Sequence, residues 1–219
     1  MIVVEPSFLI NSSPLVKTYT LEEFFDLPEP KDHSKLELIH GVLYMSPKPD
    51  WRHSTIVEII NRSLVTFIIQ SKNKGKLYFP RAGIKTGTHT WVEPDLFYLS
   101  SELLNSLAGE MPHTADIVIE VLSLSTEKYD KTTKADTYEA LDIKELWLVD
   151  AENKTIEVRE NLSSNKKWEK RVIYEMGDTL ESKLLEGFKI LIDEVFDSRL
   201  RDTNSFVSRE MSFRLHKVI

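Results

Sequence analysis

Residues 116–123, DIVIEVLS, and residues 145–150, ELWLVD, decide the fold of this chain. Both are short and almost continuously apolar, which is typical of strands that are covered on both faces. A helical pattern over about residues 126–141 separates them. The order strand, helix, strand predicts a βαβ unit around a buried sheet, and therefore an α/β fold.

The segments before this unit add a hairpin and a long helix. Residues 35–45, KLELIHGVLYM, alternate on both sides of His40-Gly41, which predicts a hairpin with a tight turn. From residue 51 to about residue 72, apolar residues recur at intervals of three and four, which predicts an amphipathic helix. Residues 20–23, TLEE, read as the capping box of a short first helix.

Shorter elements fill the rest of the chain. We expect strands at KLYFP, AGIKT and DLFYL, then a small helix near residues 101–107. After the βαβ unit, TIEVRE and KRVIYE alternate and predict an antiparallel pair, and residues 188–196 close the domain. The predicted division of the chain is an amino-terminal extension at 1–17, one domain at 18–197, and a basic and apolar tail at 198–219.

Composition excludes several classes of protein. The chain has 219 residues, no cysteine and a net charge of −7. Cysteine nucleophiles, disulfide scaffolds and thiolate metal sites are therefore excluded, and a protein that coats nucleic acid with its whole surface is disfavoured. No apolar run approaches the roughly 18 residues of a membrane span, and the first residues lack the basic start of a signal peptide. We expect a cytoplasmic protein without a membrane partner.

Positive charge is concentrated in residues 48–89, which contain eight basic and two acidic residues. Such a stretch could bind phosphates beside an otherwise acidic body. The alternative is an ordinary charged helix face with acidic neighbours in space. The candidate DNA-binding residues are Arg52, Lys72, Lys74, Lys76, Arg81 and Lys85.

Two carboxylates stand out as candidate metal ligands. Glu120 lies inside DIVIEVL, between Val118 and Leu122 on one face of the expected strand, where a charge must be paired or must hold a metal. Asp95 begins DLFYL after Pro94, a position that is also common for a turn. If both lie at adjacent strand ends, they could converge on one divalent cation, and oxygen ligands suit Mg²⁺ or Mn²⁺.

Further polar residues could support such a site. Asp130, Lys134 and Tyr138 are spaced at four and four, so they share one helix face, although an exposed ion pair would explain that spacing as well. His53 begins the long helix and could be a general base, a phosphate contact or a surface residue. Glu37 lies in the hairpin, where an exposed glutamate would be unremarkable.

Four blocks of the sequence resemble a known family. They are LELIHGVLYMSPKPDWRH, VEPDLFYLS, DIVIEVLSLST and YDKTTKADTYEALDIKELWLVD. In this order and spacing they are similar to the Uma-type restriction endonuclease family of the PD-(D/E)XK nuclease superfamily, over about residues 18–196. The resemblance implies a restriction-endonuclease-like core, in which helices flank a mixed central β-sheet and extra antiparallel strands are added. It also implies Mg²⁺- or Mn²⁺-dependent cleavage of DNA.

The resemblance assigns roles residue by residue. Asp95 takes the place of the aspartate of the motif, and Glu120 that of its acidic residue. The usual lysine would fall at Leu122, and in this family it is thought to have moved to the next helix, which implies Lys134. Glu37 and His53 match the family's amino-terminal block, and Tyr138 and Asp130 match positions of less certain role. Two departures, Leu124 for a usual proline and LDI for a usual glycine turn, touch no proposed ligand.

Two other functions stay open at this point. The nuclease fold could be retained in a non-catalytic module that binds DNA or a protein, although such a module would not need the full set of Asp95, Glu120 and Lys134. A metal-dependent hydrolase of another phosphoester, with His53 as base, is the third hypothesis. Many nucleases of this superfamily cut as dimers, so a homodimer is a further expectation.

Overall fold

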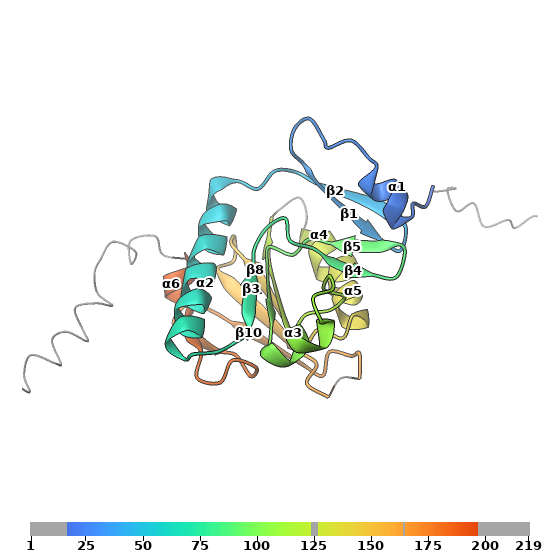
Figure 1. The fold of residues 1–219 in the computed structure, drawn as a ribbon. Coiled ribbons are helices and arrows are strands. Elements are labelled where there is room, and N and C mark those ends of the chain that lie inside the picture. Colours follow the sequence, from blue (N-terminus) through green and yellow to red (C-terminus); the bar gives the residue numbers. More distant parts are fainter. Residues whose placement is uncertain (1–16, 124–126, 164, 197–219) are drawn as a thin grey trace, which may run out of the picture.

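A six-stranded sheet forms the centre of the part of the chain that the computed structural model describes, namely residues 17–123, 127–163 and 165–196 (Figure 1). The strand order is β10-β9-β8-β7-β6-β3, with β7 and β8 parallel and the other neighbours antiparallel. The strands are β3 (Lys76–Tyr78), β6 (Leu96–Leu99), β7 (Ile117–Leu122), β8 (Glu145–Asp150), β9 (Thr155–Glu160) and β10 (Lys170–Tyr174). The predicted mixed α/β sheet with its parallel pair is confirmed.

Both faces of β7 are covered, as its apolar sequence predicts. Ile119 and Val121 pack in one core cluster with Ile60 and Leu64 of the long helix α2 (Trp51–Gln70). Val118 and Leu122 point the other way and belong to a second cluster, together with Ala135 and Tyr138 of α5 (Ala135–Ala140). Successive strand residues alternate between faces, so Glu120 projects toward α5.

The crossover from β7 to β8 is not a uniform helix. It consists of α4 (Glu127–Tyr129), a π-helical turn (Asp130–Lys134) and α5. We predicted one helix over about residues 126–141, and the helical path is confirmed from residue 127, whereas residues 124–126 lie outside the described residues. The π turn is a local insertion of a kind that occurs often at functional sites. Lys134 is its last residue.

A second sheet lies beside the central one and has the order β2-β1-β5-β4. Its strands are β1 (Lys35–Ile39), β2 (Val42–Ser46), β4 (Ile84–Thr86) and β5 (Thr90–Val92). The predicted hairpin of β1 and β2 is confirmed, with φ of 50° at His40 and 81° at Gly41, the positive values that its tight turn needs. Sequence reasoning missed the short strand β5, which joins this hairpin to β4.

The remaining elements close the ends of the core. They are α1 (Leu21–Phe25), with the predicted capping box at Thr20 and Glu23, α3 (Ser101–Leu107), β11 (Thr179–Glu181), β12 (Lys189–Leu191) and α6 (Ile192–Phe196). Sequence reasoning did not foresee β11. The predicted extension at 1–17, apart from residue 17, and the predicted tail at 198–219 lie outside the described residues. Within the described ranges, no helix is both long and apolar enough to cross a membrane.

Candidate active site

Glu120 and Lys134 form a buried ion pair at the centre of the molecule. The Lys134 Nζ lies 2.5 Å from Glu120 Oε1, and the side chain of Lys134 is 1% exposed. Tyr138, one turn further along α5, donates its hydroxyl to the same glutamate oxygen. The predicted shared face of Lys134 and Tyr138 is thus confirmed, and it faces the acidic residue of β7.

Glu37 brings the second sheet into this cluster. Its Oε1 lies 3.2 Å from Lys134 Nζ and accepts a hydrogen bond of 2.8 Å from the backbone N–H of Glu93. Asp130 Oδ1 lies 4.0 Å from the same lysine nitrogen. Three acidic side chains therefore surround one buried lysine. Glu37 is buried, not an exposed strand residue.

Asp95 and His53 form a second pair next to the first. His53 Nε2 lies 3.0 Å from Asp95 Oδ2, and the same oxygen accepts a hydrogen bond of 2.8 Å from the backbone N–H of Val121. Asp95 directly precedes β6, and Leu96 pairs with Ile119, so Asp95 lies opposite Glu120 across the strand pair. The two carboxylates are therefore neighbours across the β6–β7 pair, at the end where β6 begins.

Burial and charge set the protonation states of these groups. Burial raises the pKa of Glu120 to about 7, in spite of the opposing charges of Lys134 and Lys35. Burial alone would lower the pKa of Lys134, but Glu120 and Glu37 raise that pKa well above its usual value, so the lysine stays charged. Burial and the neighbouring carboxylates raise the pKa of Tyr138, which therefore stays a proton donor.

The pair of His53 and Asp95 is polarised as well. Burial lowers the pKa of His53, but the hydrogen bond and charge of Asp95 outweigh burial, and the pKa lies above its usual value. Burial raises the pKa of Asp95, and the hydrogen bond and charge of His53 reverse this, so that the pKa lies below its usual value. This direction favours an imidazolium paired with an aspartate. It therefore gives no support to His53 as a general base.

The oxygens of Asp95 and Glu120 fit a hard divalent cation. Within the described residues, all hydrogen bonds and ion pairs of the two carboxylates use one oxygen of each, Oδ2 and Oε1. The second oxygens, Oδ1 and Oε2, make none of these contacts. The described residues contain no group of three or more His, Cys, Asp and Glu that could hold an ion. A two-carboxylate site of this kind suits Mg²⁺, which keeps water and substrate oxygens in its remaining positions.

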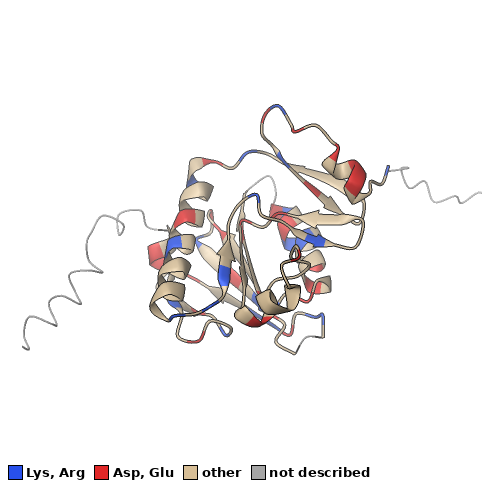
Figure 2. Cartoon of the chain, viewed as in Figure 1, with Lys and Arg blue, Asp and Glu red and all other residues tan. Residues whose placement is uncertain are grey.

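The structure does not gather the candidate DNA-binding residues into one patch. Arg52 and Lys72 lie at opposite ends of α2, whose 20 residues span about 30 Å. Basic and acidic residues are interspersed along this helix in Figure 2. Arg52 adjoins His53, and Arg81 lies 4.0 Å from Glu93, so these two are near the carboxylates. Lys72 and Lys74 follow the far end of α2, Lys76 begins β3, and Lys85 lies in β4.

Comparison with known proteins places this geometry in a family. Residues 21–193 match the Uma2 family, which carries the description "Putative restriction endonuclease". The chain belongs to the Uma2 family. Its structure resembles the crystal structure of a "putative nuclease belonging to DUF820" from Anabaena variabilis, with a TM-score of 0.66 and 19% identity over 81% of this chain and 97% of that chain. No curated protein matches the sequence. Family membership supports a nuclease, and the structural likeness shows the shared fold.

Sequence reasoning missed two residues of this Uma2 site. Lys35 donates to the Glu93 carbonyl oxygen at 2.9 Å, lies 3.8 Å from Glu37 Oε2, and is 23% exposed. Tyr129 donates to Glu37 Oε2 at 3.5 Å. Lys35 precedes Glu37 by two residues on one strand, so it shares the face of Glu37, and that spacing was the available signal. Tyr129 directly precedes Asp130, and nothing in its local sequence indicates its partner.

Proposed function

We propose that this Uma2 protein is a metal-dependent endonuclease that hydrolyses phosphodiester bonds in DNA. The observation that carries the proposal is the position of Asp95 opposite Glu120 across the β6–β7 pair, each with one carboxylate oxygen free of the contacts described above. A bound Mg²⁺ or Mn²⁺ would supply a water of lowered pKa and would stabilise charge on the phosphate. The second oxygens of the two carboxylates would hold the ion.

The protein residues around these carboxylates keep them in place. Lys134 is almost wholly buried and holds Glu120 and Glu37 by its charge. Tyr138 holds the side chain of Glu120 by its hydrogen bond, and the His53 ring does the same for Asp95. Lys35 is the more exposed of the two lysines, and we propose that it contacts the phosphate group. A charged contact of this type stabilises the charge that develops in the transition state.

DNA contact would begin with the basic residues beside the site. Arg52 and Arg81 are exposed; Arg52 precedes His53 in the chain and lies 3.9 Å from Glu152, and Arg81 lies 4.0 Å from Glu93. We propose that these two arginines contact the phosphates next to the cleaved bond. Lys72, Lys74 and Lys76 lie near the far end of α2 and could contact only a more distant part of a duplex. Removal of Arg52 should weaken DNA binding in a salt-dependent way.

The test is plasmid cleavage with Mn²⁺ by the wild type, Asp95→Asn and Asp136→Ala. Asparagine can still accept the N–H of Val121, so the substitution removes charge with little change of shape. Asp136 is an exposed aspartate of α5 and serves as the matched control. We expect cleavage by the wild type and by Asp136→Ala, and its loss in Asp95→Asn. Equal cleavage by all three proteins would refute the site.

A non-catalytic DNA-binding module is the second candidate. The observation that favours it is the direct ion pair of Glu120 with Lys134. This ion pair occupies one of the carboxylate oxygens of the proposed metal site. Such a module would bind a labelled duplex with the same affinity whether or not Mn²⁺ is present, and it would cut no plasmid. Together these two results would favour binding over catalysis.

A further inference from the structure

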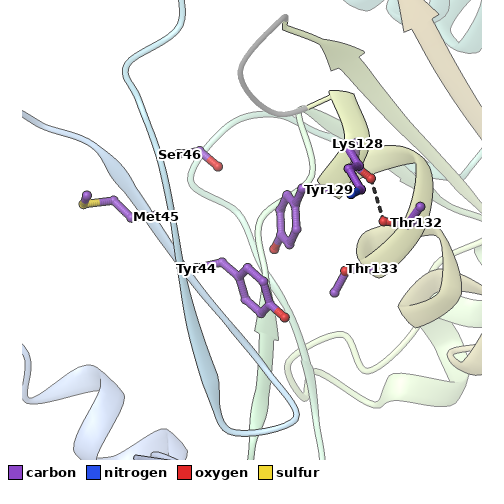
Figure 3. A pocket seen from close by; sticks show the side chains of 7 residues that line it. All are labelled: Tyr44, Met45, Ser46, Lys128, Tyr129, Thr132 and Thr133. Carbon is purple, nitrogen blue, oxygen red and sulfur yellow. Dashed lines mark hydrogen bonds between the residues drawn. The ribbon is translucent and has the colours of Figure 1, made fainter. Parts of the chain in front are cut away.

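A pocket of about 380 Å³ opens between β2 and the crossover helix, beside the carboxylate cluster (Figure 3). Its volume lies in the range of sites for small organic ligands. The residues that line it are Tyr44, Met45, Ser46, Lys128, Tyr129, Thr132 and Thr133. None of these residues is acidic. The pocket therefore differs in charge from the cluster next to it.

Strand register joins the pocket to the proposed active site. Tyr44 pairs with Glu37 and Ser46 pairs with Lys35 across the β1–β2 hairpin. Directly opposed residues of an antiparallel pair project from the same face with their Cβ atoms about 5 Å apart. Tyr129 makes a second link, because its ring lines the pocket while its hydroxyl donates to Glu37. A ligand in the pocket would therefore lie next to Glu37 and Lys35.

The walls of the pocket suit an aromatic ligand with polar edges. The rings of Tyr44 and Tyr129 stack with centroids 4.6 Å apart and planes inclined by 26°, and Figure 3 shows them as neighbours. Tyr129 is fixed by Glu37, whereas Tyr44 lies on the edge strand of its sheet. Within the described residues, the Tyr44 hydroxyl has no hydrogen-bond partner. Ser46, Thr133 and Lys128 add two hydroxyls and an ammonium group to the lining of the pocket.

We propose that this pocket binds the base of a nucleotide adjacent to the phosphodiester that is cleaved. The inference rests on the proposed nuclease function and names a subsite of it. The base would pack against the tyrosine wall, with Lys128 near a flanking phosphate. Stacking on an aromatic side chain is tolerant of sequence, because every base has a π-face. The pocket would thus position a strand without selecting one base.

The test measures binding without metal, so that cleavage plays no part in it. Fluorescence anisotropy with EDTA would compare a labelled single-stranded oligonucleotide with an abasic oligonucleotide of the same length. The full-length proteins would be the wild type, Tyr44→Ala, Tyr44→Phe and Phe25→Ala. Phe25 is an exposed ring on α1 that also pairs with another ring, Trp91, and lies outside the pocket. Thermal unfolding would verify that each variant is folded.

We expect Tyr44→Ala to weaken binding of the base-containing oligonucleotide about tenfold, which is the usual loss for one stacked base. Tyr44→Phe and Phe25→Ala should stay within about threefold of the wild type, since the first retains the ring. Abasic DNA should bind the wild type and Tyr44→Ala equally.

This pattern supports the pocket even if no protein cuts plasmid, because the absence of cleavage would refute only the nuclease function. A folded Tyr44→Ala that prefers base-containing DNA as strongly as the wild type does would overturn the pocket, even if plasmid cleavage is observed. A wild type that binds both oligonucleotides equally would do the same.

Discussion

Two glutamates lie buried in adjacent parallel strands of the central sheet, and their partners differ in kind. Glu145, at the start of β8, accepts hydrogen bonds from neutral donors: the Trp147 indole, the Ser182 hydroxyl, and the backbone N–H groups of Lys183 and Leu184. Glu120, within β7, is held by the Lys134 ammonium and the Tyr138 hydroxyl. Both are buried, and burial raises the pKa of both.

The difference shows why burial alone does not identify a functional carboxylate. Both oxygens of Glu145 accept hydrogen bonds, and those from residues 182–184 tie that turn to the start of β8. Glu120 uses one oxygen for its partners, lies opposite Asp95, and shares its lysine with Glu37. A carboxylate whose bonds are all to neutral donors stabilises the fold. One that shares a buried cation with other acids is a candidate for chemistry.

The largest effect should follow removal of the buried lysine. Lys134→Met would leave Glu120 without its cation and Glu37 with only Lys35, and loss of one partner of a buried pair costs about 3–5 kcal/mol. Urea unfolding measures this loss. Lys189→Met is the matched control, because Lys189 also lies 2.5 Å from a glutamate, Glu181, but the pair is exposed. Exposed ion pairs contribute little to stability, so this variant should lose much less. Similar losses in both variants would refute the distinction between the two regions.

The sequence indicates the Glu120 side of this contrast, but not the Glu145 side. The position of Glu120 inside an apolar run marks a buried charge, and the spacing of Lys134 and Tyr138 predicts a common helix face. Both follow from local periodicity. The roles assigned by family resemblance, including those of His53 and Glu37, stay predictions, although the structure does bring these residues together.

The rest could not be foreseen, because it depends on contacts between distant segments. Glu145 begins an apolar strand, and nothing near it indicates that residues 182–184 donate to it. Strand β5 has three residues and all three are buried, so it shows no alternation of buried and exposed positions. The π turn at Asp130–Lys134 has residues that would also fit an α-helix. The basic residues of the segment 48–89 are close in sequence, yet helix length separates them in space.

Glu145→Gln should lower stability without lowering activity. The amide nitrogen replaces one accepting oxygen, so a buried donor among Trp147, Ser182 and the backbone N–H groups loses its partner, at a cost of about 1–3 kcal/mol. Urea unfolding and plasmid cleavage, measured on the same preparation, give the two results. Glu120→Gln is the comparison, and it should lose activity by at least about a hundredfold. A loss of cleavage in Glu145→Gln as large as in Glu120→Gln would mean that the two regions are not separate.

Mn²⁺ should raise the melting temperature of the wild type and of Glu145→Gln. Asp95 and Glu120 repel each other without an ion, and a ligand that binds only the folded state stabilises it. At ten times its dissociation constant, the ion would add about 1.4 kcal/mol. Differential scanning fluorimetry with and without Mn²⁺ measures the shift. Asp95→Ala should lose it, and an equal shift in that variant would place the binding of the ion elsewhere.

The smallest effect concerns pH and separates the two glutamates by linkage. Burial raises the pKa of Glu145, so over the window between its unfolded and folded pKa values the folded protein binds more protons than the unfolded chain. The contribution of Glu145 to stability is therefore complete below the unfolded pKa and declines as pH rises through the folded pKa. Glutamine does not titrate, so the stability of the wild type relative to Glu145→Gln should fall as pH rises above the usual pKa range of glutamate.

Urea unfolding of both proteins at a series of pH values measures this difference in stability. The titrations of Glu120 and His53 occur in both proteins and largely cancel from it. A difference that grows with pH would mean that the hydrogen bonds from neutral donors outweigh burial. The pKa of Glu145 would then be lowered in the folded protein, and the neutral donors would stabilise its anion.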